Sequence, residues 1–331
     1  MDAIRHHSFG PPETLVLEQV TDPVPGPGQV LVAAEAHGVH LLDTTIRRGE
    51  ASGPLPLPGL PTIPGREVAG TVTATGPDVD PAWVGRRVAA HLGATPDGGG
   101  YARLAVVAEA SLHALPDGVD LPDAIAMIGT GRMALMTLEV AQIGADDVVV
   151  VTAAAGGLGS LFVQAALGDG ARVLALAGGP AKVRAVRALA PDAGQRLAVV
   201  DYRAPGWADR AREALGRLDA PGATVVLDGV GGEAGAAAAR LLGTGGRLVV
   251  HGWSSGSPAT TAETASDVDV RDVLGPNAPS FGDLRAYQQR ALGLAAAGAW
   301  RVLTHRVPFA EAARAHRELE ERRTTGKVVL V

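Results

Sequence analysis

The sequence contains no cysteine, and this absence excludes a wide range of chemistry. None of its 331 residues can form a disulfide bond, act as a thiol nucleophile, hold an iron–sulfur cluster or bind zinc as a thiolate. Lysine is nearly absent as well, since only Lys182 and Lys327 occur. Aromatic residues make up 3% of the chain, which is too few for a base-stacking surface. Because lysine is so rare here, the position of each of the two lysines is informative.

The charges also lack the basic surplus that binding to nucleic acid or an anionic membrane requires. The chain carries 29 basic and 35 acidic residues, for a formal net charge of -6. Its hydrophobic content of 47% is typical of globular proteins, and its length predicts about two domains. The first residues lack the apolar core and cleavage site of a secretory signal. We therefore expect a cytoplasmic protein with a small-molecule substrate and no nucleic-acid or membrane partner.

The first 118 residues or so contain short β-branched runs separated by proline and glycine. Such runs begin near residues 29, 67, 86 and 101, and they predict a compact, mostly-β domain. Residues 53–64 contain five prolines, which exclude a helix or a central strand there. This segment is either an ordered surface loop or part of the lining of a cleft.

From about residue 119 the pattern changes to alternating strands and helices. Strand-like runs occupy residues 148–153, 172–178, 196–202, 223–229 and 246–252, and residues 268–274 would form a sixth strand. This alternation is typical of an α/β fold with a doubly wound parallel sheet. We predict a nucleotide-binding domain at residues 119–280 and a first domain at 1–118 that residues 281–331 complete.

The uncharged run from Val148 to Gly168 is long enough to cross a bilayer, but its sequence fits a nucleotide-binding turn better. Residues Ala154, Ala155, Gly156, Gly157, Leu158 and Gly159 match the G-x-G-x-x-G fingerprint, with alanine in the first place. Gly156 would let backbone amides approach a pyrophosphate, and Gly159 would let the helix pack on the strand. A tight strand–helix turn without a ligand is the alternative, but four further strand–helix units favour a dinucleotide.

The end of the second strand of this domain indicates which dinucleotide binds. NAD-binding sheets place a carboxylate there, whereas this chain has no acidic residue between Asp169 and Asp192. Instead Gly178 is followed by Lys182, one of only two lysines, where a 2′-phosphate would lie. The sequence therefore predicts NADPH. The alternative is that Lys182 is a solvated helix residue.

Several blocks of the sequence occur in a familiar order, among them FGPPETLVLEQV, PVPGPGQVLV, IPGREVAG, GGYARLAVV, TAAAGGLGS, VVLDGVGG and TTGKVVLV. In these the chain resembles the medium-chain dehydrogenase/reductase superfamily, and within it the zinc-free quinone oxidoreductase (zeta-crystallin-like) branch. The resemblance implies a GroES-like catalytic domain built from both chain ends, a Rossmann domain between them, a cleft for nicotinamide, and a homodimer.

The resemblance also extends the set of candidate cofactor-binding residues. Tyr202 matches a position that helps to hold the 2′-phosphate, although a packing tyrosine is equally compatible with its place at a strand end. His251 follows the fifth strand, where it is either a cofactor neighbour or a catalyst. Lys327, in the final block, completes the set.

Zinc-dependent relatives hold their metal with residues that this chain has replaced. At the first two ligand positions stand His40 and Arg66, and a cation at the second position would repel a metal ion. The four-cysteine structural lobe is missing as well. We therefore expect no catalytic metal.

Without a metal, reduction depends on placing the acceptor correctly, on hydrogen bonds to the developing oxyanion and on a proton donor. His40, Asp43, Arg66 and Arg132 are the candidate catalytic residues, with Thr45 and His251 as further pocket candidates. Two structural alternatives stay open. Asp43 could cap a turn against which His40 packs, and Arg66 could pair with Glu67 or another buried carboxylate.

The chain departs from its branch mainly at positions that would contact the acceptor. His40, Thr45 and Met133 stand where quinone oxidoreductases usually have asparagine, tyrosine and threonine, and Gly178 replaces a serine that often precedes the phosphate lysine. We expect a metal-free, NADPH-dependent reductase of a quinone or an α,β-unsaturated carbonyl. A non-catalytic, crystallin-like NADPH-binding protein and an alcohol dehydrogenase-like enzyme are the alternatives.

Overall fold

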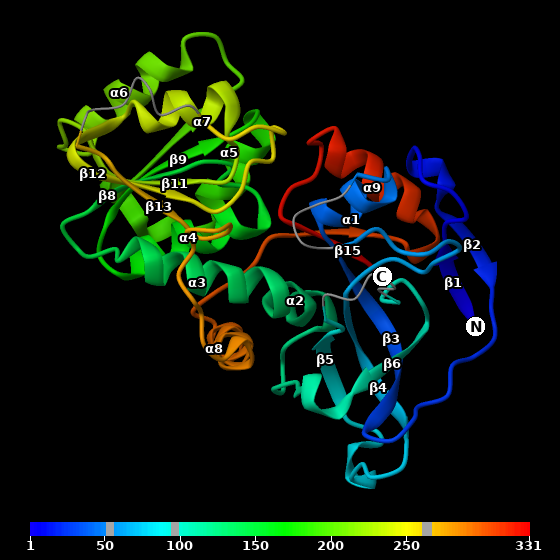
Figure 1. Cartoon of the computed structure of the whole chain (residues 1–331). Helices are drawn as coiled ribbons and strands as arrows, with labels where there is room; N and C mark the ends of the chain where they lie inside the picture. Colours follow the sequence, from blue (N-terminus) through cyan, green and yellow to red (C-terminus); the bar gives the residue numbers. More distant parts are fainter. Residues whose placement is uncertain (51–55, 94–98, 260–266) are drawn as a thin grey trace. The chain divides into compact units, whose positions relative to one another are not determined.

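The computed structural model describes residues 1–50, 56–93, 99–259 and 267–331 (Figure 1). The chain divides into two compact units, one formed by Met1–Arg132 with Arg285–Val331 and the other by Met133–Leu284. Of the proline-rich segment at 53–64, residues 53–55 lie outside the described residues. The remainder is a loop without helix, in which Thr62 forms an isolated β-bridge with His6.

The first unit is built on a mostly antiparallel sheet that combines strands from the N-terminal and C-terminal parts of the chain, and among its described strands only β14 and β15 pair in parallel. Its strand order is β14-β15-β3-β4-β5-β7, with β6 also paired to β3. A separate hairpin joins β1 to β2. The strands are β1 (Asp2–Arg5), β2 (Val16–Gln19), β3 (Gln29–Val39), β4 (Glu67–Thr75), β5 (Arg87–His91), β6 (Leu104–Ala108), β7 (Leu112–Ala114), β14 (Thr304–Val307) and β15 (Lys327–Leu330).

The register of this sheet brings distant residues to one edge. The last strand, β15, pairs antiparallel with β3, so that Val328 lies opposite Val39, and β3 pairs with β4, so that His37 lies opposite Val68. The end of β3 therefore meets the starts of β4 and β15. Alternate residues of β3 and β4, among them Val30, are buried in a common core.

Short helices flank the sheet of the first unit. Helix α2 packs against β3, β4 and β5, and the division between the units accordingly falls after Arg132, later than the predicted boundary at residue 118. The helical elements are η1 (Pro12–Thr14), α1 (Leu41–Arg47), η2 (Pro81–Trp83), η3 (Glu109–Ser111), α2 (Leu121–Ala126), the π-helical turn η4 (Met127–Gly131), α8 (Leu284–Ala296), η6 (Phe309–Glu311) and α9 (Ala312–Glu320).

The second unit contains the predicted doubly wound sheet. Its strand order is β10-β9-β8-β11-β12-β13, and every pairing is parallel. The strands are β8 (Val148–Val151), β9 (Arg172–Ala177), β10 (Leu197–Asp201), β11 (Ala223–Asp228), β12 (Leu242–Val250) and β13 (Asp269–Asp272). The order reverses between β8 and β11, and ligands of such sheets bind at the carboxyl ends of the strands beside this reversal.

Helices cover the sheet of the second unit, so its central strands β8, β9 and β11 are largely apolar on both faces. Helices α6 and α7 pack on one face over Val150, Leu174 and Val226, and Figure 1 shows α4 on the other side of the strands. The helical elements are α3 (Arg132–Ala141), α4 (Gly157–Gly168), α5 (Pro180–Leu189), η5 (Pro191–Arg196), α6 (Trp207–Arg217) and α7 (Gly232–Ala239).

One continuous helical stretch among the described residues, Leu121–Ala141, is apolar and long enough to cross a bilayer. The structure buries 72% of the apolar 18-residue window within this stretch, as is usual for the core helices of globular proteins. The uncharged run at 148–168 is interrupted instead, because it forms β8, a glycine turn and α4.

Candidate functional site

The loop between β8 and α4 presents free backbone amides at a helix N-terminus. Helix α4 begins at Gly157, and its N-cap residue Gly156 provides no side chain to bind the first amides. Ala153 has a positive φ of 46°, and the Gly156 amide donates to the Ala153 carbonyl at 2.7 Å. An uncapped helix N-terminus at the switch point of a parallel sheet is suited to an anionic group such as pyrophosphate.

Gly159 is the residue of this loop that tolerates no side chain. A Cβ atom at this position would lie 2.7 Å from Ala154 Cα and closer still to the Ala153 carbonyl oxygen. Both atoms belong to the backbone and cannot move out of the way. The first turn of α4 therefore packs directly against the strand end, which holds its amides in place.

At the turn after β9, Gly178 lies against Tyr202. A Cβ atom on Gly178 would lie 2.8 Å from the Tyr202 hydroxyl, so the Tyr202 ring covers this glycine. Lys182 lies in the first turn of α5 and is half-buried. Asp201, which the sequence pattern did not single out, accepts hydrogen bonds on its Oδ1 from the amides of Gly179 at 2.8 Å and Arg203 at 2.9 Å. Asp201 thus uses a carboxylate oxygen to shape the turn.

A second carboxylate that the sequence analysis did not name shapes the edge of the sheet. Asp228, at the end of β11, is fully buried and accepts a hydrogen bond from Thr152 Oγ1 at 2.9 Å. It also accepts from the amides of Val230 at 3.0 Å and Gly231 at 3.1 Å. The sequence contains one signal for Asp228, because this residue stands directly before the glycines of the DGVGG run. A pocket at these strand ends is lined by Thr152, Ala153, Leu176, Tyr202, Trp207, Val230 and Ala234.

His251 follows β12 and is buried against an aromatic ring. Its imidazole makes an edge contact with Phe162, with 5.0 Å between ring centroids, and its ring fills the space beside Gly229. Burial lowers the pKa of His251 to about 4, so the ring is neutral at physiological pH. Its Nε2 has no hydrogen-bond partner among the described residues.

In the first unit, His40, Glu67 and Lys327 meet where β3, β4 and β15 adjoin. His40 Nε2 lies 2.8 Å from Glu67 Oε2, and Lys327 Nζ lies 3.1 Å from the same oxygen. Lys327 Nζ is also 3.0 Å from His40 Nε2. The sequence predicts Lys327 as a cofactor-binding residue, whereas its contacts here are to a histidine and a carboxylate of the first unit. The sequence pattern points to Glu67 only as one of the carboxylates that could pair with Arg66.

The carboxylate of Glu67 is completely enclosed. Its side chain has an exposed fraction of 0%, and Cβ atoms on Gly38 or Gly129 would collide with its two oxygens. Burial by itself would raise the pKa of Glu67, but the charges of His40 and Lys327 hold it well below its usual range. Gly129 belongs to the π-helical turn η4, a type of irregularity that is common at functional sites. Glu67 is therefore an anion in the interior of the first unit.

Asp43 fixes the start of α1 and is the end of a buried hydrogen-bonded chain. Its Oδ2 accepts a hydrogen bond from the backbone amide of His40 at 2.8 Å and another from the Tyr101 hydroxyl at 3.2 Å. The Tyr101 hydroxyl is also 3.1 Å from His316 Nε2. Arg66 Nε lies 3.9 Å from Asp43 Oδ1. Asp43 therefore completes the start of α1, where it accepts from the amide of the N-cap residue His40, and it lies near the cation Arg66.

Burial controls the ionisation of this chain of groups. It raises the pKa of Tyr101 well above its ordinary value, and Asp43 adds to the effect. It lowers the pKa of His316 to about 3, and the charge of Arg47 acts in the same direction. Tyr101 and His316 are therefore neutral hydrogen-bonding groups across the physiological range.

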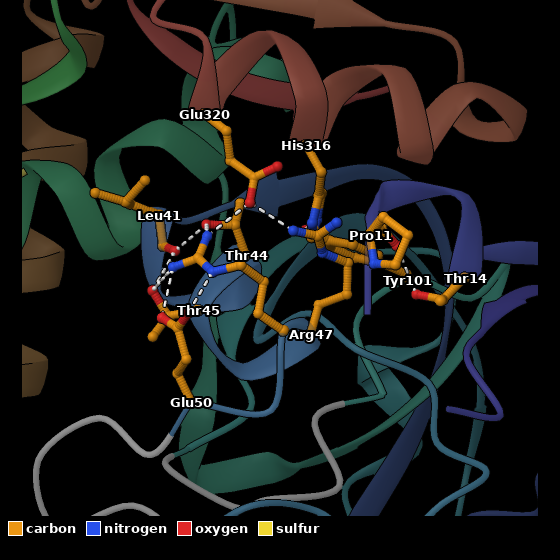
Figure 2. Close-up of polar contacts among 11 residues, drawn as sticks. Pro11, Thr14, Leu41, Thr44, Thr45, Arg47, Glu50, Tyr101, His316 and Glu320 are labelled. Atoms are coloured by element: carbon orange, nitrogen blue, oxygen red, sulfur yellow. Dashed lines mark hydrogen bonds and ion pairs between the residues drawn. The ribbon is translucent and has the colours of Figure 1, made fainter. Parts of the chain in front are cut away.

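Helix α1 is anchored to α9 by charged side chains (Figure 2). Arg47 Nη2 donates to Glu320 Oε1 at 2.5 Å, and Arg48 Nη1 donates to the same oxygen at 2.6 Å. Thr45, a pocket candidate, uses its hydroxyl to bind the Leu41 carbonyl at 3.3 Å within the helix. These contacts hold the helix whose N-cap is His40.

Arg132 and His91 complete the charged surroundings of Glu67. Burial lowers the pKa of Arg132, while the negative charge of Glu67 opposes that shift. Burial also lowers the pKa of His91 to about 4, again against the effect of Glu67. The structure therefore surrounds one carboxylate with several basic groups.

The residues at this position do not fit a zinc ion. His40 is in contact with the cation Lys327, and Arg66 brings a second positive charge beside it. Within the part of the chain that the structure describes, no group of three or more histidine, aspartate or glutamate side chains is arranged to hold a metal. A catalytic zinc site needs three protein ligands and a structural one needs four.

The nucleotide site, by contrast, has the features that a dinucleotide requires: an uncapped helix N-terminus, a glycine that a Cβ would fill, and a lysine at the next turn. Two family models match parts of this chain. The family described as alcohol dehydrogenase GroES-like domain matches residues 26–117, and the one described as zinc-binding dehydrogenase matches residues 196–330.

Relatives match the chain over almost its whole length. A quinone oxidoreductase of Pseudomonas aeruginosa is 34% identical, over 99% of this chain and 98% of its own. A 2-haloacrylate reductase of Burkholderia is 29% identical, over 98% of this chain and 97% of its own. The crystal structure of an Escherichia coli quinone oxidoreductase complexed with NADPH is 27% identical, covers 100% of both chains and has a TM-score of 0.81. The chain therefore belongs to the quinone oxidoreductase branch of the medium-chain dehydrogenase/reductase superfamily.

Proposed function

We propose that this protein is an NADPH-dependent reductase that needs no metal ion and acts on a quinone or an α,β-unsaturated carbonyl compound. The observation that carries the proposal is the nucleotide loop of the second unit, with its uncapped α4 N-terminus and the close approach at Gly159. The adjoining turn supports NADPH over NADH, because it presents Lys182 and Tyr202 and its Asp201 carboxylate is bound to backbone amides.

In this proposal the cofactor contacts are divided among three groups of residues. In the turn from Ala154 to Gly159, the amides of the first turn of α4 would hold the pyrophosphate, because those of Ala154 and Gly156 are already bonded to backbone carbonyls. Lys182 with Tyr202 would hold the 2′-phosphate. His251 would be a neutral neighbour of the dinucleotide, since its pKa is lowered to about 4. The contacts of Lys327 are to His40 and Glu67, so we assign it to the surroundings of the proton donor and not to the cofactor.

When bound, NADPH supplies the hydride, and the reduction of a quinone or a conjugated double bond needs one proton in addition. We assign delivery of this proton to His40, which is the partly exposed member of its cluster, with 27% of its side chain accessible. Asp43 holds the His40 backbone at the start of α1. Arg66 and Arg132 contribute positive potential that favours an oxyanion on the acceptor.

The acceptor is expected to be conjugated, because the cations around His40 do not suit a metal ion that would polarise a simple ketone. The names of the relatives point the same way, since quinones and 2-haloacrylate are both conjugated acceptors. His40, Thr45 and Met133 differ from the usual residues of the branch, so we propose an acceptor that differs from the common quinones. By resemblance to the branch, we also propose a cytoplasmic homodimer.

The direct test is oxidation of NADPH, followed at 340 nm, with a panel of quinones and enones. The assay is run with and without a metal chelator and repeated with NADH. Turnover that prefers NADPH and is unaffected by the chelator is the expected result. Tight NADPH binding without turnover across the panel would favour a binding protein instead. Loss of turnover with the chelator would contradict the metal-free proposal.

A further inference from the structure

The cluster of His40, Glu67 and Lys327 places a carboxylate and an ammonium group in the interior of the first unit, and close packing by itself does not require such charges. Glu67 and Lys327 are fully or almost fully buried, on β4 and β15, strands that each pair with β3. An ion pair in such a place costs desolvation free energy, and pairs of apolar residues often stabilise a fold equally well. The third member of the cluster, His40, is the only one with substantial exposure. The buried pair therefore faces the one group that can exchange protons with solvent or substrate.

The geometry determines which nitrogen of His40 is engaged. Nε2 lies 2.8 Å from Glu67 Oε2, so the carboxylate stabilises a proton on Nε2. Lys327 Nζ, at 3.1 Å from the same oxygen, can satisfy that oxygen in place of the histidine.

The two buried charges act on His40 in opposite directions. The carboxylate of Glu67 favours the imidazolium form, and the ammonium of Lys327, 3.0 Å from Nε2, disfavours it. Other charged or titratable groups that face this cluster are Arg66, His91, Arg132 and Asp43. Two of them are permanent cations and His91 is neutral, so Glu67 and Asp43 are the balancing negative charges.

We propose that Glu67 and Lys327 are a pair of positioning residues that fix the tautomer of His40 and set the pH at which it gains and loses its proton. Glu67 holds the proton on Nε2 and stabilises the charged ring. Lys327 offsets part of that stabilisation, so that the ring can release its proton to an acceptor and recover it from water. The inference rests on the proposed function in that His40 is the proton donor there.

The test is a histidine titration followed by two-dimensional ¹H–¹⁵N NMR of the full-length protein labelled on its imidazole nitrogens. Glu67→Gln should lower the midpoint of the His40 titration by about one pH unit, and Lys327→Met should raise it by about one pH unit. The ¹⁵N shifts of neutral His40 should show the proton on Nε2 in the wild-type protein. A merely structural pair would not move the midpoint in opposite directions.

Two further variants keep the test informative if a single variant does not fold. The double variant Glu67→Gln with Lys327→Met contains neither charge, and its midpoint should return toward that of the wild-type protein. Lys327→Arg retains the charge and should leave the midpoint within about 0.3 pH unit. His305 and Glu318 form a matched control pair, with Nε2 also 2.8 Å from Oε2. Glu318→Gln should leave the His40 midpoint unchanged.

Shifts in the same direction in both single variants, or shifts below about 0.3 pH unit, would overturn the inference. The titration does not depend on turnover, so it separates this inference from the proposed function. If the midpoints move as expected, the pH profile of kcat should move with them. A kcat profile that stays fixed while the His40 midpoint moves would support the charge-setting pair but reject His40 as the proton donor.

Discussion

The two units of this protein form their candidate sites in different ways. In the second unit the site is made by the backbone, through the free amides of α4 and the close approach at Gly159. In the first unit it is made by charged side chains, with Glu67 surrounded by His40 and Lys327. A backbone site depends on the space around a few consecutive residues, whereas a side-chain site depends on the balance of charges from several strands. The two should therefore fail under different perturbations.

Acidification should distinguish the units most strongly. Burial lowers the pKa of His37, His91 and His316 in the first unit to between about 3 and 4, and lowers that of His251 in the second unit to about 4. Between about pH 4.5 and 6.5 the unfolded chain therefore binds more protons than the folded one. The stability that these neutral histidines provide is complete above pH 6.5 and is lost as the pH falls.

Each buried histidine can contribute up to about 1.4 kcal/mol of lost stability per pH unit in this window. We expect the first unit to lose several kcal/mol between pH 7 and pH 5, and the second unit less. Hydrogen exchange measured by mass spectrometry at both pH values would report on the units separately. Equal loss of protection in the two units would contradict the comparison.

A substitution of His40 should affect chemistry and leave cofactor binding intact. We expect His40→Ala to lower kcat by about a hundredfold or more, because general acid catalysis typically contributes a factor of about 10²–10⁴. The dissociation constant for NADPH, measured by fluorescence titration, should stay within about twofold of the wild-type value. An unchanged kcat would exclude His40 as the proton donor.

A substitution of Gly159 should have the opposite signature. We expect Gly159→Ala to weaken NADPH binding by about a hundredfold and to destabilise the fold by about 1–3 kcal/mol, because its Cβ would overlap the backbone. Gly168→Ala is the matched control, since it lies at the other end of α4 with nothing within 4 Å of the added atom. Equal effects of the two substitutions would show that only helix propensity had changed.

The smallest effect is expected at Lys182. Lys182→Ala should weaken NADPH binding by about ten- to a hundredfold, the equivalent of roughly 1.5–3 kcal/mol for a charge-assisted hydrogen bond. NADH affinity should stay the same, since NADH lacks the 2′-phosphate. Arg187→Ala, on the exposed side of the same helix, serves as a control. Unchanged NADPH affinity in Lys182→Ala would remove this residue from the cofactor site.

Much of the fold could be predicted because its signals are local. Alternating apolar runs predicted the strands from β8 to β13 and their helices, and the glycine fingerprint lies between β8 and α4 as expected. The turns that carry Asp201 and Asp228 were not predicted in detail, since either carboxylate could equally have faced solvent. Only the structure shows that both are bound to backbone amides.

The sequence by itself determined the fold class, the absence of thiol chemistry and the place of the nucleotide loop, because each depends on residue type or on neighbouring residues. The tertiary structure decided that Lys327 meets His40, which lies 287 positions earlier in the chain. That contact follows from the pairing of β15 with β3, and the strand register is set by the packing of the whole sheet. It also decided that Glu67 is the buried anion between them, since burial and charge balance depend on every element that encloses a side chain.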